Sequence, residues 1–376
     1  MKRPSGRGPG VALFGAVVRE YAELLVVLIA AAVAVILPGP GRWLADRHGI
    51  DVALAALVAC TAVGLPVRRA PGPSRDAGAA PRTEAGAAAG AEARTAAWTG
   101  AAVDAGAGAG AGGAGAAVVD RLRVGLALGV PAVVLPVAGW LASRLVGPAS
   151  LRDGMLTVGL APAEVASVAA VSIAGGDSAL AAVLLVGSTL VAVVASGPAL
   201  RLLAGGGAGA ASPDPWGVLV NLAVVVALPL VVGLAVRTAI PPSRVRERVV
   251  AAGPVALVTI LVWLVASQVV ITRAYVGVLG AAVVFLALST VVGVLLGRGA
   301  AQPVATTVLL TTSMRDFAIA AGIATAAFGP ASAGPLGLYG VLVIVWGMAL
   351  AGDRRRRNRS DAQTGLAVGP GGLQPD

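Results

Sequence analysis

Apolar runs close to the length that spans a bilayer recur along the chain, separated by short segments that hold most of the charge. A transmembrane α-helix needs about 20 consecutive apolar residues. Only 12% of the residues are charged, against about 25% in soluble domains. Because only helices and closed barrels satisfy their backbone groups inside lipid, these runs predict an all-α polytopic membrane protein.

We predict ten transmembrane helices in a multi-pass protein of the plasma membrane. The first run is longer than the 7–15 apolar residues of a signal peptide, and no clean small-residue cleavage site follows it, so we interpret it as a true span. The expected ranges are 21–37, 52–67, 124–146, 154–174, 179–203, 216–236, 250–271, 274–296, 304–328 and 336–351.

The segments between these helices suggest how the chain is divided. Residues 68–119 are rich in Ala and Gly and cannot bury enough apolar surface to offset their ordering entropy, so we expect a flexible cytoplasmic loop. The remaining parts are an N-terminal tail with helices 1 and 2 (1–67), helices 3–5 (120–203), helices 6–10 (214–352) and a basic cytoplasmic tail (353–376).

The arginines lie mostly at the ends of alternate runs. Cytoplasmic loops of membrane proteins carry an excess of Lys and Arg, and most of the 28 such residues fall on one side if both termini are cytoplasmic. The net charge of +10 is therefore a sign of topology, and we expect the lipid bilayer and no nucleic acid as a partner. Six arginines are expected on the outer side: Arg42, Arg47, Arg144, Arg152, Arg201 and Arg273.

Few side chains in the chain could support catalysis. Cys60 is the single cysteine and His48 the single histidine. The predicted spans hold no His, Cys or paired-Asp constellation, so we expect neither an enzyme nor a metal site nor a cofactor.

Two of the predicted helices are interrupted at their centres. The fourth contains Pro162 and Glu164, and the ninth contains Arg315 and Asp316. They are the fourth members of the first and second sets of five helices. Interrupted segments in corresponding halves are typical of transporters built from inverted repeats. We therefore predict two inverted five-helix repeats, with helices 4 and 9 crossing at mid-membrane. A crossing helix or a cation would satisfy the carbonyls that Pro162 frees, and half-helix N-termini would suit an anion.

The charges at these breaks allow two interpretations. In one, Glu164, Arg315 and Asp316 neutralise one another and hold the crossing together. In the other, Arg315 holds a substrate carboxylate or serves as a structural charge, while Glu164 or Asp316 exchanges protons.

Hydroxyl side chains near the breaks could also line a site, although hydroxyls in membrane helices often bond only to the preceding turn. These residues are Ser167, Ser172, Ser188, Thr189, Thr311, Thr312 and Ser313. The candidate substrate- or ion-binding residues are Pro162, Glu164, Ser167, Thr311, Thr312, Ser313, Arg315 and Asp316.

Several short motifs stand out at residues 161–167, 174–180, 188–190, 314–320 and 328–330, with Pro136 and the following Ala-Gly-Trp of helix 3. Together they resemble helices of the bile acid:sodium symporter family, within the bile acid/arsenite/riboflavin transporter superfamily. The resemblance implies a panel domain and a core domain with helices 4 and 9 crossing in the core. It also implies transport of organic anions, usually with sodium.

The chain departs from the sodium-coupled members of that family. Glu164 and Val168 replace a Gly and an Asn of helix 4, and Thr311, Arg315 and Asp316 stand where helix 9 offers Glu and Gln-Asn. Sodium prefers several oxygen ligands, and Arg315 would put a fixed positive charge at one sodium position. We therefore predict a carrier of a small organic anion in which sodium coupling is lost, weakened or altered, with a proton or the substrate's own gradient as the driving force.

Two alternatives remain open. The first is efflux of arsenite or another oxyanion, which the resemblance to arsenite exporters suggests, but Ala163 occupies the position of their cysteine. The second is a membrane scaffold or sensor that transports nothing and works through its long loop and basic tail.

Overall fold

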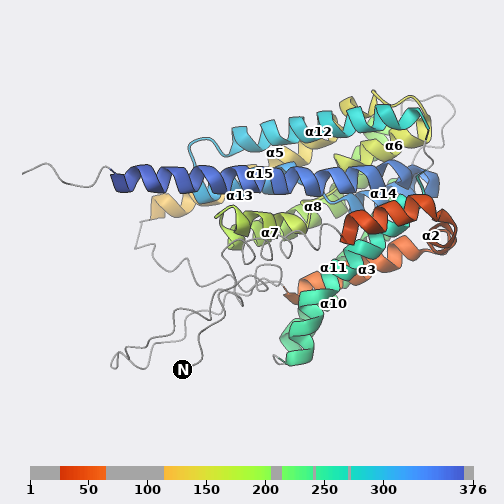
Figure 1. The fold of residues 1–376 in the computed structure, drawn as a ribbon, viewed down its shortest axis with the longest axis horizontal. Helices are drawn as coiled ribbons and strands as arrows, with labels where there is room; N and C mark the ends of the chain where they lie inside the picture. Colours follow the sequence, from red (N-terminus) through yellow and green to blue (C-terminus); the bar gives the residue numbers. More distant parts are fainter. Residues whose placement is uncertain (1–25, 65–113, 205–213, 240–242, 270–271, 368–376) are drawn as a thin grey trace, which may run out of the picture.

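The computed structural model describes residues 26–64, 114–204, 214–239, 243–269 and 272–367 (Figure 1). All regular structure within these ranges is helical, which confirms the predicted all-α class. The first half contains a helical stretch Val26–Ile36, α2 (Pro38–Ala45), α3 (Gly49–Gly64), α5 (Ala114–Ser143), α6 (Ala149–Val158), α7 (Ala166–Ile173) and α8 (Ser178–Ala204).

The second half continues with longer and shorter helices in alternation. They are α9 (Pro215–Leu222), a π-helical turn η1 (Ala223–Ala227), α10 (Leu228–Ala239), α11 (Arg244–Ala266), α12 (Ala274–Leu296), α13 (Gln302–Ser313), α14 (Phe317–Phe328), a 3-10 turn η2 (Pro330–Ala333) and α15 (Gly334–Ala367).

Six of the described helices are long and apolar enough to cross a membrane. A seventh candidate is the pair Val26–Ile36 and Pro38–Ala45, which bends by 93°. The other predicted spans do not qualify as single helices, because α3 is short and the fourth and ninth are broken. The six are Val124–Ser143, Ser178–Ala204, Pro215–Ala239, Arg248–Ala266, Ala274–Leu296 and Pro330–Asn358.

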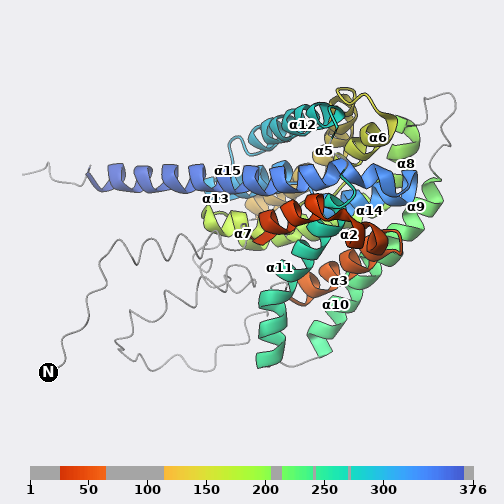
Figure 2. The same cartoon turned by 45° about the vertical axis from the view of Figure 1, so that its right-hand side comes forward.

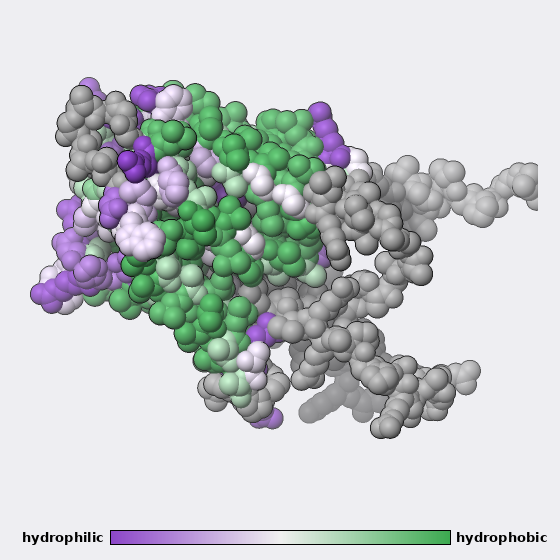
Figure 3. All heavy atoms as spheres, turned by 180° about the vertical axis from the view of Figure 1, so that it is seen from behind, coloured by the Kyte–Doolittle hydropathy of each residue, from purple (hydrophilic) through white to green (hydrophobic). Residues whose placement is uncertain are grey.

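The outer surface of the bundle is apolar, as a lipid-facing surface should be. Large aliphatic side chains such as Val133, Val194 and Val276 point outward and are exposed. Figure 3 shows hydrophobic residues over most of one face, with hydrophilic residues gathered mainly at its left edge. In water such a surface would be a strong aggregation liability, whereas lipid tails solvate it.

The helices form two groups, which Figures 1 and 2 show from two angles. In the smaller group α3 packs against α10 and α11, and α2 packs against α11. Close approach is possible because Gly233 of α10 lies directly against the Ala59 carbonyl of α3. The larger group contains α5, α6, α7, α8, α12, α13, α14 and α15, and it holds both broken helices.

Proline residues have different consequences in different helices. Pro131 and Pro136 lie inside α5, which stays continuous as helix. Pro229 is the second residue of α10, which follows the π-helical turn η1. A proline frees a carbonyl one turn earlier, and a local π-helical adjustment is a common response. The chain therefore accommodates Pro229 with a widened turn.

Two predicted boundaries differ from the structure. The flexible loop predicted for 68–119 falls mostly outside the described residues, and its last part is helical because α5 begins at Ala114. The basic tail predicted from residue 353 is helical as far as Ala367, as a continuation of α15. Figure 2 shows α15 running past the end of the bundle.

Candidate functional site

The two helix breaks cross and bond to each other through their backbones. The Glu164 N–H donates to the Met314 carbonyl at 2.9 Å, and the Asp316 N–H donates to the Pro162 carbonyl at 2.9 Å. Between these bonds, Ala163 and Arg315 form an isolated antiparallel bridge. Each break thus satisfies backbone groups that the other helix leaves unpaired, which the interior of a membrane requires. The carbonyl that the crossing segment satisfies is that of Pro162 itself.

Helix α8 supports the crossing from one side. The Ser188 hydroxyl accepts a hydrogen bond from the Ala163 N–H at 3.0 Å and donates to the Leu185 carbonyl. Ser196 donates to the Ala192 carbonyl of its own helix, and its oxygen lies 3.4 Å from the carbonyl of Leu160. Both serines therefore serve the backbone around the proline break.

The N-terminus of α14 is occupied by carboxylates of the protein itself. One oxygen of Asp316 accepts from the N–H groups of Ala318 and Ile319 at 2.9 and 2.8 Å, as an N-cap. Glu164 accepts from the N–H of Phe317 at 3.3 Å. Both carboxylates are 2% exposed. The expectation that this helix end would present free N–H groups to an anion is therefore wrong.

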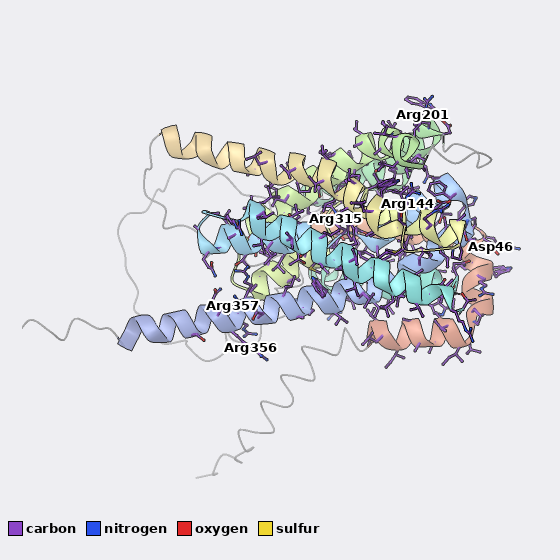
Figure 4. The ribbon with its side chains drawn as sticks, turned by 90° about the horizontal axis from the view of Figure 1, so that it is seen from above. Asp46, Arg144, Arg201, Arg315, Arg356 and Arg357 are labelled. Carbon is purple, nitrogen blue, oxygen red and sulfur yellow. The ribbon has the colours of Figure 1, made fainter. Side chains whose placement is uncertain are left out.

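Arg315 is buried without a carboxylate partner. Its side chain is 5% exposed, and its Nε atom is buried with no hydrogen-bond partner. No ion pair within the described ranges joins its guanidinium to Glu164 or Asp316. Figure 4 shows Arg315 midway along the long axis of the molecule. The three charges are therefore not joined by ion pairs within the described residues, although the charges of Arg315 and Asp316 attract each other.

Arg315 and Asp316 line two different clefts, although they are neighbours in the chain. Met314 and Asp316 have extended backbone angles, and successive side chains of an extended segment point to opposite sides. The empty space is about 530 Å³ in the cleft beside Arg315 and about 430 Å³ in the one beside Asp316, part of it open to the surroundings in each case.

We name the two clefts after these residues. The Arg315 cleft lies between α5 and α8 and includes Leu128, Leu184, Ser188, Val191, Thr312 and Arg315. The Asp316 cleft lies between α3, α8 and α10 and includes Val58, Thr61, Val186, Thr189, Leu230 and Asp316. Helix α8 contributes a different face to each cleft.

The other predicted hydroxyls are divided by the structure. Thr311 and Thr312 line the Arg315 cleft, where Thr311 donates to the Thr307 carbonyl of its own helix. Ser313 donates to the Leu310 carbonyl and lines neither cleft. Ser167 is fully buried, and its hydroxyl has no hydrogen-bond partner among the described residues. Ser172 also lies outside both clefts.

Several residues of the Arg315 cleft were not among the candidates predicted from the sequence. Ser196 lines it, and so do Leu128, Pro131 and Pro136 on α5. Part of the signal was present in the spacing, because Leu128 and Pro131 are three residues apart and so lie on one face of a helix.

These features define the class of the protein: an integral multi-pass helical membrane protein with two broken helices crossed at its centre. Residues 114–275 match the family described as "Sodium Bile acid symporter family". The match supports membership of this chain in the bile acid:sodium symporter family, whose members are transporters. It covers α5 to the start of α12, so it includes the break at Pro162 and ends before Arg315. No curated protein matches the chain.

Proposed function

We propose that this protein is a secondary transporter of a small organic anion, with its substrate site at the crossed breaks. The observation that carries the proposal is the buried guanidinium of Arg315, which faces a cleft and has no carboxylate partner among the described residues. An ionisable residue inside a membrane domain marks a substrate or ion pathway by default. Membership in a transporter family points the same way.

For the architecture, we propose ten transmembrane helices in two inverted five-helix repeats. The bent N-terminal pair, α3 and α5 would be helices 1 to 3, and the broken pair α6–α7 and α8 would be helices 4 and 5. Helix 6 would be α9–α10, followed by α11, α12, the broken pair α13–α14 and α15. Each break would then lie in the fourth helix of its repeat, within the segment boundaries predicted from the sequence.

For the orientation, we propose that both termini are cytoplasmic and that the protein lies in the plasma membrane. Figure 4 supports this arrangement, because Arg144 and Arg201 lie toward one end of the molecule and Arg356 and Arg357 toward the other. The first pair was predicted to be outside and the second inside from the Lys/Arg distribution.

For the coupling, we propose that sodium is not required. Arg315 supplies a fixed positive charge at the crossing, and one oxygen of each nearby carboxylate accepts hydrogen bonds from backbone N–H groups of α14. A proton carried by Glu164 or Asp316, or the gradient of the substrate, would then drive transport.

The proposal is tested by uptake of a panel of labelled organic acids into proteoliposomes under imposed proton or substrate gradients. Hydrogen bonds to charged groups contribute about 1.5–3 kcal/mol, so Arg315→Gln should slow uptake at least ~tenfold. Glu164→Gln should change the response to the proton gradient. Uptake of no panel member, or full activity in both variants, would contradict a carrier and favour a scaffold.

The arsenite alternative gains no support from the position of the single cysteine. The Cys60 thiol lies in α3 and donates to the Val249 carbonyl at 3.5 Å. It lines neither cleft.

A further inference from the structure

The Arg315 guanidinium has hydrogen-bonding capacity that the described part of the protein does not use. An arginine side chain offers five N–H donors and no acceptor. No described residue accepts a hydrogen bond from this side chain, and its Nε atom has no contact with solvent. A buried charge without a partner is costly, so the site is built to receive an acceptor from outside the chain.

The residues that line the Arg315 cleft indicate the chemistry of the ligand that carries this acceptor. Leu128, Leu184 and Val191 are aliphatic, and among the described residues that line the cleft only Arg315 is charged. Thr312 adds a hydroxyl that no described residue bonds. The Ser188 and Ser196 hydroxyls already donate to α8 carbonyls. The available groups are therefore one planar cation, one hydroxyl and an apolar surface.

The two nearby carboxylates do not line this cleft. Asp316 lines the opposite cleft and caps α14, and Glu164 accepts from the Phe317 N–H. An anion in the Arg315 cleft would therefore face the guanidinium directly, whereas an anion in the Asp316 cleft would face a carboxylate. One face of α8 thus borders a cleft that favours an anion, and the other borders a cleft that disfavours one.

We propose that the Arg315 cleft, between α5 and α8, binds a small monocarboxylate with a short apolar body. The carboxylate accepts from the fork of Arg315, whose geometry matches a carboxylate in a bidentate arrangement, and from the Thr312 hydroxyl. The apolar body lies against the aliphatic side chains of α5 and α8. The biological role of this site rests on the proposed transport of organic anions, but binding to the site can be tested without transport.

The test is thermal unfolding of the purified full chain in detergent, with benzoate as the probe and benzylamine as its cationic counterpart. A ligand that binds only the folded state raises Tm in a saturable way. We expect benzoate to stabilise the wild type and benzylamine to have no effect. Arg315→Gln should abolish the shift, and Thr312→Val should weaken apparent benzoate affinity severalfold.

Two variants on opposite faces of α8 locate the site. Ala195→Phe narrows the Arg315 cleft and should weaken benzoate binding at least tenfold. Val186→Phe narrows the Asp316 cleft and should leave the benzoate affinity within twofold of the wild-type value. If Ala195→Phe does not fold, Ala132→Phe on α5 makes the same test from the facing wall.

The proposal is overturned if benzoate, butyrate and acetate all fail to shift Tm of the wild type, if Arg315→Gln binds benzoate normally, or if Val186→Phe is the variant that loses binding. These failures differ from failure of the transport function. Binding that follows the predicted pattern without uptake would end the carrier proposal alone. Uptake that is lost in Val186→Phe and kept in Ala195→Phe would end this inference alone.

Discussion

Arg315 and Asp316 are adjacent in the chain, yet the structure gives them separate tasks. Asp316 caps α14 with an oxygen that accepts two backbone N–H groups. Arg315 turns to the other side of an extended segment and lines a cleft. The difference depends on three residues of non-helical backbone between α13 and α14. Had the helix continued, both side chains would have pointed within 100° of each other.

The capping role of Asp316 can be separated from its charge. Asp316→Ala removes the acceptor for two buried N–H groups and should destabilise the protein by about 1–2 kcal/mol. In Asp316→Asn a side-chain oxygen remains, and Asn is a good N-cap residue. The free energy of unfolding should therefore fall by roughly 0.5 kcal/mol or less. The measurement is Tm of both variants in one detergent. Equal losses for Ala and Asn would show that the charge, and not the cap, stabilises this position.

A second prediction concerns Ser188. Ser188→Ala leaves the N–H of Ala163 without its acceptor, and an unsatisfied buried donor costs about 1–3 kcal/mol. The matched control is Ser143→Ala, because the hydroxyl of Ser143 donates only within its own helix. We expect a clear fall in Tm for the first variant and little change for the second. Similar behaviour of the two would argue against the role of α8 in holding the proline break.

At the scale of elements, the sequence predicted that helices 4 and 9 are broken, and the structure places both breaks where expected. A proline and a charge inside apolar runs are strong local signals, because each disrupts a membrane helix for a different reason. The hydrogen bonds that join the breaks could not be predicted, since backbone pairing depends on the rotation of each half-helix. The same applies to the two clefts, which require knowing that residues 314–316 are extended.

The C-terminal helix is the element that hydropathy described least well. Arg354 to Arg357 ended the apolar run and suggested a tail, but arginine is a good helix former. Asp353 and Arg357 also form an ion pair at 3.0 Å with i,i+4 spacing. Local propensity therefore continues α15 beyond the predicted end of the span.

The extension of α15 connects the broken helices to each other. The Asn358 side chain donates to the Ala174 carbonyl at the end of α7 and accepts from Gln302 at the start of α13. Asn358→Ala should lose about 1 kcal/mol and expose both helix ends to faster hydrogen exchange. Arg356→Ala, a change at an exposed residue two positions earlier in the same helix, should neither lower stability nor speed exchange at these helix ends. Unchanged exchange at Ala174 and Gln302 in the first variant would contradict the connection.

At the scale of the whole molecule, composition and run length were enough to predict a multi-pass helical membrane protein. They work because the bilayer imposes one requirement on every span. The identity of the substrate and of the driving ion depends on a few side chains at the crossing, where composition has no influence. The family match ends before the second break, so the chemistry of Arg315 has to be argued from its own surroundings.

The central claim is that Arg315 provides the positive charge at the crossing, so that anion transport does not need sodium. The most direct measurement is the initial rate of organic-anion uptake into proteoliposomes as sodium is varied from none to saturating, for the wild type and for Arg315→Gln. We expect a wild-type rate that does not depend on sodium and a variant that is slow at every sodium concentration. A steep, saturable sodium dependence that persists in Arg315→Gln would contradict it.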